Sequence, residues 1–255
     1  MERMMAGLPV VAGAEWPGVR YFCTTRGGGV GQAPFDTFNL GIRAGDAPEA
    51  VAENRRRLAA VLPGEPRWLR QVHANAVHDA DAPAPQGEIA ADASVTTCPG
   101  QVLAVMVADC LPVLLADARG QVLGAAHAGW RGLSSGVLEN TLSLMQAKRP
   151  QAQGWRAWVG PGIGPAHFEV GADVLQAFGA EGDAEVAAHF KPASPGKWLA
   201  DLPALARLRL TRAGVQTVEL SGYCTYRERD RFFSYRRDRE TGRMALLAWL
   251  EHTPD

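Results

Sequence analysis

Runs of apolar, β-branched residues recur along the chain and predict the strands of its core. Short continuous runs of this kind, bounded by glycine, proline or polar residues, are typical of strands covered on both faces. They lie at residues 18–24, 102–108, 113–117, 122–127, 155–160, 215–220 and 244–250. The chain is therefore expected to contain several buried β-strands.

Three segments between these runs carry apolar residues at helical spacing. They lie at residues 49–62, 133–147 and 201–213, and the second places five apolar side chains on one face. The third opens with Asp201 and closes at Gly214, residue types that favour the two ends of a helix. These patterns predict three helices.

The order of the predicted strands and helices is mixed, without regular alternation. Arg119 and Gly120 suit a tight hairpin turn between the runs at 113–117 and 122–127. This order favours an α+β fold over a doubly wound parallel sheet. No repeat, low-complexity tract or long linker divides the 255 residues, so one domain spanning residues 1–255 is expected.

Composition and charge are those of an ordinary soluble protein. Hydrophobic residues make up 47% and charged residues 21%, and the net charge of −1 offers no case for nucleic-acid or membrane binding. An apolar run near the N-terminus weakly resembles a signal peptide, but Glu2 and Pro9 interrupt that pattern. The four cysteines form no CxxC pair, which fits reduced thiols and a cytoplasmic location.

Cys110 and His127 fall at the same end of the predicted hairpin, away from the turn. Cys110 follows one apolar run and precedes Pro112, and His127 ends the neighbouring strand. Their distances from the turn are similar, so their side chains could converge on a metal. The alternative is that Cys110 is a small buried apolar residue and His127 a hydrogen-bonded core histidine.

Further polar residues flank these two positions. His127 is followed by Ala-Gly-Trp-Arg-Gly and a predicted helix, and a helix N-terminus together with Arg131 favours an anion such as phosphate. The glycines could equally form a tight turn, with Arg131 in a structural ion pair. Asp109 and Asp92 are candidate proton carriers or partners of the ligands.

Three other segments have weaker signals. Residues 24–41 are glycine-rich and carry Arg26 and Asn39, which suits either an anion cradle or a hairpin loop. Residues 160–171 lack the spacing of a dinucleotide loop and fit the wall of an active site better. His73 lies in an expected strand, and nothing in its spacing links it to the hairpin.

Eleven stretches along residues 16–250, taken together and in order, resemble the YfiH family, bacterial proteins also described as laccase-domain or multicopper polyphenol oxidase-like. The stretches are TTRGGGV, FDTFNLG, GDAPEAVAENRRRL, WLRQVH, ADASVTT, VMVADCLPVLLAD, AAHAGWRGL, VGPGIGP, FEVG, CTY and FFSYRRDRETGRMA. No single stretch identifies the family, but their order does.

The resemblance implies a four-layer αββα sandwich with mixed sheets and a metal site formed by His73, Cys110 and His127. Zinc is the expected metal, with copper as the alternative. Three protein ligands leave a tetrahedral metal one open position, which suggests chemistry. The chain departs from the family pattern at Ala74, where glycine is usual, and at Arg43, where histidine is common.

The family carries three functional descriptions. Zinc-dependent purine nucleoside phosphorolysis of adenosine, inosine or methylthioadenosine, with adenosine deamination in the same site, suits an open metal position beside an anion pocket. Copper-dependent polyphenol oxidation is disfavoured because the six histidines include no HxH pair. Editing of a peptidoglycan precursor, with Cys110 as nucleophile, is the third; a non-catalytic zinc-binding protein is a further alternative.

We therefore expect a monomeric enzyme whose partners are a nucleoside and phosphate. Cys110, Arg26, Arg131 and Asp109 are the expected catalytic residues. Asn39, Arg43 and Arg131 are expected to bind substrate.

Overall fold

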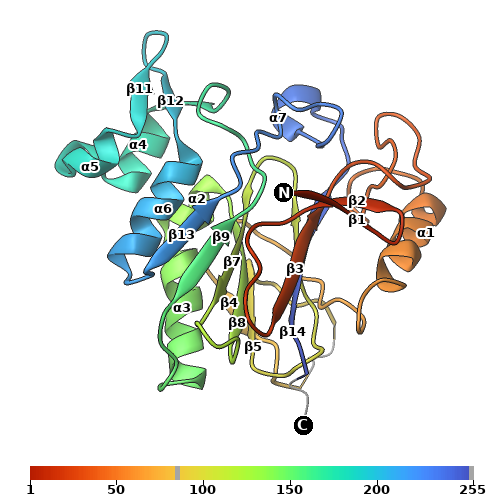
Figure 1. The fold of residues 1–255 in the computed structure, drawn as a ribbon. Coiled ribbons are helices and arrows are strands. Elements are labelled where there is room, and N and C mark those ends of the chain that lie inside the picture. Colours follow the sequence, from red (N-terminus) through yellow and green to blue (C-terminus); the bar gives the residue numbers. More distant parts are fainter. Residues whose placement is uncertain (84–86, 253–255) are drawn as a thin grey trace.

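A computed structural model describes residues 1–83 and 87–252 of the chain. Two large sheets and a small one form its framework (Figure 1). The first sheet has, in order, β1 (Glu2–Met5), β2 (Leu8–Val11), β3 (Val19–Thr24), β14 (Met244–Leu250) and β6 (Leu103–Val107). The second has β13 (Thr217–Leu220), β9 (Arg156–Val159), β7 (Leu111–Ala116), β8 (Leu123–Ala128), β5 (Ala93–Thr96) and β4 (Val77–Asp79). The small sheet has β10 (Glu169–Val170), β12 (Trp198–Ala200) and β11 (Phe190–Pro192).

The described residues form seven α-helices, and the three longest cover the outer sides of the two large sheets (Figure 1). The seven are α1 (Pro48–Ala59), α2 (Trp130–Ser134), α3 (Val137–Lys148), α4 (Ala172–Phe178), α5 (Ala184–Ala187), α6 (Leu202–Arg212) and α7 (Tyr235–Asp238), with a 3-10 turn at Ala180–Gly182. Helices α3 and α6 pack on the six-stranded sheet, and α1 lies on the side of the five-stranded sheet (Figure 1). The resulting order of layers is the expected αββα sandwich with an α+β fold.

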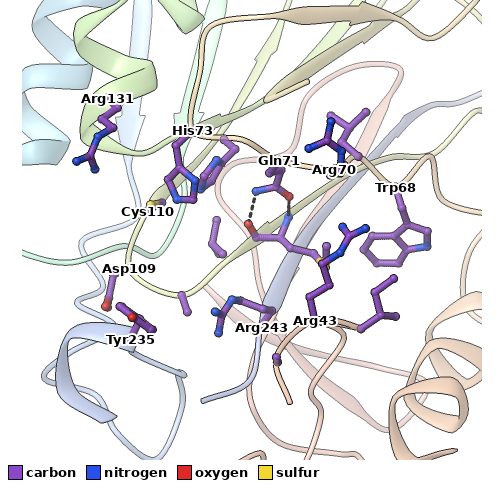
Figure 2. A pocket seen from close by; sticks show the side chains of 18 of the residues that line it. Arg43, Trp68, Arg70, Gln71, His73, Asp109, Cys110, Arg131, Tyr235 and Arg243 are labelled. Carbon is purple, nitrogen blue, oxygen red and sulfur yellow. Dashed lines mark hydrogen bonds between the residues drawn. The ribbon is translucent and has the colours of Figure 1, made fainter. Parts of the chain in front are cut away.

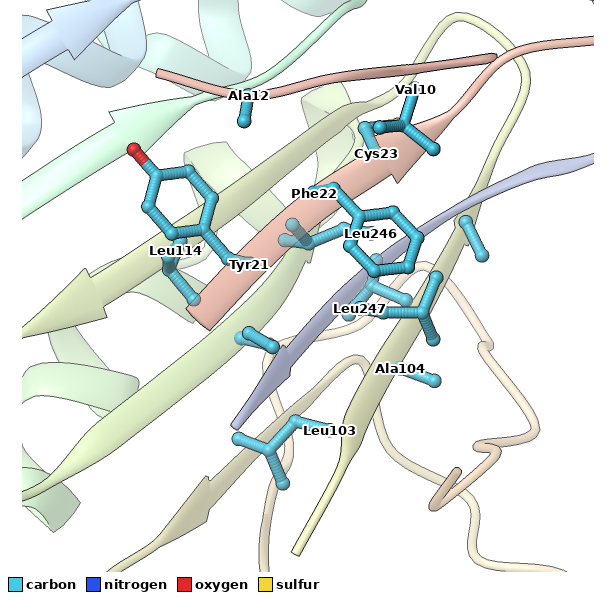
Figure 3. Packing of buried hydrophobic residues seen from close by; sticks show 14 of the residues in the cluster. Val10, Ala12, Tyr21, Phe22, Cys23, Leu103, Ala104, Leu114, Leu246 and Leu247 are labelled. Atoms are coloured by element: carbon cyan, nitrogen blue, oxygen red, sulfur yellow. The ribbon is translucent and has the colours of Figure 1, made fainter. Parts of the chain in front are cut away.

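The core lies between the two large sheets. Phe22, Leu246 and Leu247 from the five-stranded sheet lie in the same buried cluster as Leu114 from the six-stranded sheet (Figure 3). Trp158, also from the six-stranded sheet, belongs to this cluster. None of these five side chains is more than 1% exposed. Covering on both faces explains why β14 and β7 are continuous apolar runs instead of alternating ones.

The predicted hairpin is present, since β7 and β8 pair antiparallel around the turn at Arg119 and Gly120. The predicted helix over residues 133–147 is wrong in one respect: it is two helices, α2 and α3. Gly136 separates them with a φ of 96°, a left-handed conformation that ends one helix and re-aims the next. The sequence pattern also missed β1, β2, β4, β5 and the small sheet.

No helix within residues 1–83 and 87–252 combines the length and the apolar character needed to cross a bilayer.

Replacement of Leu114 by alanine tests the packing between the sheets. We expect the free energy of unfolding to fall by about 2–5 kcal/mol, because the fully buried side chain would leave a cavity that both sheets border. Urea denaturation of the two proteins measures the difference. Met4→Ala serves as the control: this side chain is 67% exposed, and its loss should cost less than about 0.5 kcal/mol. Equal effects of the two substitutions would contradict this description of the core.

Candidate active site

A cavity of about 860 Å³ lies where the chain passes from β6 to β7. One end of it is lined by His73, Cys110 and His127. The opposite end is lined by Trp68 and by arginines that include Arg70 (Figure 2). The volume falls in the range of small-molecule sites, roughly 300–1,000 Å³. The lining residues come from separate stretches of the sequence, around residues 41–55, 68–73, 106–110, 127–131 and 235–243, so the cavity forms only when the sheets and loops come together.

The side chains of His73, Cys110 and His127 meet at the first end. These three residues are here called the trio. Their ligand atoms all lie within 4.8 Å of one another. The two imidazole rings are edge-on, with centroids 4.8 Å apart. The structure thus brings together the three side chains that the hairpin and the family resemblance singled out, and their role as metal ligands remains a prediction.

Cys110 owes its position to the link between the two large sheets. Residues 108–110 connect β6, in the five-stranded sheet, to β7, in the six-stranded one. Within this link Asp109 has a φ of 92°, a conformation that few non-glycine residues adopt. Its carboxylate accepts hydrogen bonds from Thr225 Oγ1 (2.6 Å) and the Arg236 backbone N–H (2.7 Å). Both carboxylate oxygens therefore accept hydrogen bonds that fix the position of Asp109, and its catalytic role stays a prediction.

Asp92 holds the two histidines of the trio. Its carboxylate accepts hydrogen bonds from three consecutive backbone N–H groups, those of Val72 (3.1 Å), His73 (2.9 Å) and Ala74 (2.9 Å). The same carboxylate lies 2.8 Å from His127 Nδ1. Asp92 is completely buried and immediately precedes β5, the strand that pairs with β8. One carboxylate thereby fixes the positions of two side chains that are far apart in sequence.

The expected strand around His73 is absent, which corrects the sequence prediction. His73 lies in a loop with a φ of 59°, in the left-handed region. The three hydrogen bonds to Asp92 hold this backbone conformation and offset its cost. Ala74, where the family usually has glycine, has no positive φ, so this departure is accommodated without backbone strain.

The electrostatics of the trio favour a thiolate. Burial alone would raise the pKa of Cys110, but His127 and His73 outweigh burial and lower that pKa below its ordinary value. Burial would likewise lower the pKa of His127, but Cys110 and Asp92 outweigh burial and raise it. Thiolate is the form of cysteine that binds metals.

The donor set of the trio fits a metal ion. The Asp92 carboxylate engages His127 at Nδ1, which leaves Nε2 as the nitrogen available to a metal. Two imidazoles and one thiolate are ligands that zinc accepts in tetrahedral sites, with the fourth position left open. Among the described residues this is the one group of three or more such side chains that could hold a metal.

The predicted anion-binding and substrate-binding residues divide into two groups. Arg131 and Arg43 line the cavity. Arg131 lies 4.2 Å from the centre of the Trp130 ring, at the trio end, and Arg43 is hydrogen-bonded to Glu88. The helix that follows His127, α2, is only five residues long, so its N-terminus adds little to an anion site, and anion binding by Arg131 stays a prediction.

Arg26 and Asn39 do not line the cavity, so the sequence hypothesis for these two residues is wrong in its placement. The Arg26 guanidinium donates to the backbone O (2.8 Å) and Oδ1 (2.9 Å) of Asp36, and to the backbone O of Arg229 (3.0 Å). Asn39 is fully buried and accepts from the backbone N–H of Arg243 (2.8 Å). Both residues stabilise the glycine-rich loop against the C-terminal part of the chain.

Sequence reasoning missed several lining residues. Gln71 makes two hydrogen bonds with the backbone of Met106: its Nε2 donates to the carbonyl (2.7 Å), and its Oε1 accepts from the N–H (2.8 Å) (Figure 2). Trp68, Arg55 and Arg243 also line the cavity. The only signal for Arg243 was its place in a stretch of basic and aromatic residues before the final strand. Residues 160–171 contribute to the wall of the cavity, as expected from their sequence.

Comparisons with known proteins agree over nearly the whole chain. Residues 20–251 match the family model described as multi-copper polyphenol oxidoreductase laccase. A purine nucleoside phosphorylase of Pseudomonas aeruginosa is 48% identical over 241 residues, which cover 93% of this chain and 97% of that protein. The purine nucleoside phosphorylase YfiH of Escherichia coli is 48% identical over 241 residues, covering 92% and 97%.

Solved structures show the same agreement. A Neisseria meningitidis protein superposes with a TM-score of 0.86 at 45% identity, over 96% of this chain and 100% of that chain. The hypothetical protein YfiH of Bacillus licheniformis superposes with a TM-score of 0.87 at 28% identity, over 98% and 99%.

Replacement of Asp92 by asparagine tests its hold on the trio. Asparagine would present an NH₂ donor to a backbone N–H or to His127, so we expect unfolding free energy to fall by about 2–4 kcal/mol. Metal affinity, measured by competition with a chromogenic chelator, should weaken roughly 10–100-fold.

Asp81→Asn is the matched control for this prediction. Asp81 is also a carboxylate that accepts from a backbone N–H and a side chain, but it does so beyond the other end of β5, with Thr97. Its substitution should destabilise the protein without changing metal affinity. A comparable loss of metal affinity in both variants would refute a specific role for Asp92.

Gly129→Ala probes the close packing around the trio. A Cβ at this position would lie 2.8 Å from Cys110 Sγ and 3.3 Å from His73 Cδ2. We expect a stability loss of about 1–3 kcal/mol and roughly tenfold weaker metal binding, since the ligands must move apart. Gly182→Ala, where no atom lies within 4 Å of the added Cβ, should change neither quantity in thermal melts and metal titrations. Unaltered metal affinity in Gly129→Ala would contradict the packing argument.

Proposed function

The chain belongs to the YfiH family, whose model is described as multi-copper polyphenol oxidoreductase laccase, and from this membership and the cavity we propose that it is a zinc-dependent purine nucleoside phosphorylase. The observation that carries the proposal is that one cavity contains both the trio and arginines beside it. Two relatives at 48% identity bear the name purine nucleoside phosphorylase, which supports the same activity.

Phosphorolysis requires phosphate to be held beside the ribose. An oxygen of phosphate bonds to ribose C1′ while the glycosidic C–N bond breaks, so that the base leaves with a proton and ribose 1-phosphate forms. Arg131 and Arg243 are the residues that we assign to phosphate, because both line the cavity and neither forms an ion pair among the described residues. Arg243 replaces Arg26 in this role. Its guanidinium Nη1 donates to the carbonyls of Thr241 (2.7 Å) and Gly242 (2.9 Å), which fixes its direction.

The trio would hold the metal in this enzyme. Zinc bound there would supply Lewis-acid polarisation of a substrate atom at its open position. Asp92 keeps His127 oriented, and His73 is held through its own backbone N–H. Arg43 and the other cavity walls would orient the nucleoside, for which adenosine, inosine and methylthioadenosine are the proposed substrates. Deamination of adenosine to inosine is proposed for the same cavity.

Copper-dependent polyphenol oxidation has less support, although the family model carries that description. A multicopper cluster needs several groups of histidines, whereas the described residues contain one group of three potential ligands. We therefore favour a single zinc ion over copper at the trio.

A second candidate is hydrolytic editing of a peptidoglycan precursor, with Cys110 as nucleophile. The lowered pKa of Cys110, caused by the two adjacent histidines against the effect of burial, is what favours it. A thiolate that is bound to zinc is a poor nucleophile, so metal occupancy separates the two candidates.

Product analysis tests the proposal directly. Zinc-replete protein is incubated with adenosine, inosine or methylthioadenosine, with and without phosphate, and the products are resolved by chromatography. We expect adenine or hypoxanthine and ribose 1-phosphate (its methylthio form from methylthioadenosine) only when phosphate is present. Inosine from adenosine, formed without phosphate, would report deamination.

Cys110→Ala should lower turnover at least roughly 100-fold, because it removes a metal ligand. Cys98→Ala is the matched control, since Cys98 is exposed and lies outside the cavity. Absence of turnover by the wild-type protein, or full turnover by Cys110→Ala, would exclude the proposed function. Hydrolysis of a peptidoglycan precursor that is fastest with metal-free protein and is lost in Cys110→Ala would instead favour the second candidate, in which the thiol is the nucleophile.

A further inference from the structure

The end of the cavity opposite the trio is formed by Arg43, Arg55, Trp68 and Arg70, here called the arginine end (Figure 2). We propose that this end binds a phosphate group carried by the substrate itself, so that the preferred substrates are purine nucleoside 5′-monophosphates. This inference rests on the proposed function, since it adds a substrate class to the same site.

Charge is the first argument. The described residues that line the cavity include six arginines and two carboxylates, whereas the whole chain has a net charge of −1. The arginines are Arg43, Arg55, Arg70, Arg131, Arg236 and Arg243, and the carboxylates are Glu88 and Asp109. A concave surface lined by one sign of charge attracts ligands of the opposite sign. A neutral nucleoside with one phosphate co-substrate leaves about half of this excess positive charge without a partner.

Arg55 gives the second argument. It extends from α1 into the cavity wall, is partly buried, and forms no ion pair among residues 1–83 and 87–252. Its Nε donates to the Leu40 carbonyl (2.9 Å), and its guanidinium lies 4.1 Å from the centre of the Trp68 ring. Burial lowers the pKa of Arg55, because it disfavours the charged form, and no carboxylate among the described residues pairs with the guanidinium. An anion in the cavity would compensate this charge.

Glu88 neutralises only part of the remaining charge at this end. Its carboxylate is hydrogen-bonded to Arg43 and lies 3.7 Å from Arg70 Nε. Three arginines therefore face one carboxylate. The excess of two positive charges matches a phosphate monoester, which carries about −1.5 to −2 charges at pH 7.

The two ends separate two phosphate positions. The co-substrate phosphate is assigned to Arg131 and Arg243, near the trio, and the 5′-phosphate to the arginine end (Figure 2). The bond changes are those of phosphorolysis: phosphate bonds to C1′, the C–N bond breaks, and the products are the base and ribose 1,5-bisphosphate. No further reactant is needed.

Calorimetric titration of the zinc-replete protein with AMP and with adenosine tests this assignment. Inorganic phosphate is omitted, because phosphorolysis during the titration would add the heat of reaction and free phosphate would compete with AMP for the arginine end. We expect AMP to bind at least roughly tenfold more tightly than adenosine, as charge-assisted hydrogen bonds to one phosphate allow. Arg55→Gln and Arg43→Gln should each reduce this ratio several-fold.

Arg56→Gln is the matched control, because Arg56 lies on the same helix but is exposed, outside the cavity, and paired with Glu53. It should leave the ratio unchanged. Equal affinities for AMP and adenosine, or a ratio that neither cavity variant alters, would overturn the proposal. Arg43 is exposed, so its variant decides the question even if Arg55→Gln fails to fold.

The binding ratio does not depend on turnover, which separates this inference from the proposed function. Cleavage of adenosine without any preference for AMP would reject the arginine end as a phosphate site and leave phosphorolysis standing. A preference for AMP without cleavage would do the opposite.

Discussion

The hydrogen bonds to the Asp92 carboxylate are the interaction on which the cavity depends. A buried carboxylate is costly unless it is hydrogen-bonded, and here three backbone N–H groups and His127 satisfy it. Burial would raise the pKa of Asp92, but these hydrogen bonds lower it, so the group stays ionised. Because Asp92 immediately precedes β5, the sheet that forms the core also sets the geometry of the trio.

The link between the two large sheets completes this arrangement. Residues 108–110 carry the chain from one large sheet to the other and present Cys110 at the crossing. Asp109, inside this link, receives hydrogen bonds from Thr225 and Arg236, which belong to the C-terminal part of the chain. The trio end is thus held from three sides, and the arginine end adds residues from α1 and the loop that follows it.

Local patterns in the sequence predicted the parts of the structure that depend on local physics. Apolar runs gave most strands of the two large sheets, and the hairpin at Gly120 brought Cys110 and His127 together. The position of Arg55 in the cavity could not be predicted in this way, because three consecutive arginines in a helix are typical of a solvent-exposed face. How the helix docks decides which of the three faces the cavity. The converse holds for Arg26. Its place in a glycine-rich loop suggested an anion site, but its guanidinium donates hydrogen bonds to backbone carbonyls instead. His73 required the family resemblance, since its loop is held by Asp92, a residue remote in sequence.

The antiparallel pairing that assembles the trio has a consequence for the order of events during folding. Cys110 and His127 approach each other through a local hairpin, whereas His73 joins them only after β5 has docked beside β8. Contacts between distant segments form later than local ones, because more chain entropy is lost when they close. A nascent chain therefore offers two ligands early and the third late. If the trio binds a metal as proposed, tight binding of the ion requires a complete tertiary structure, and an incompletely folded chain competes poorly for it.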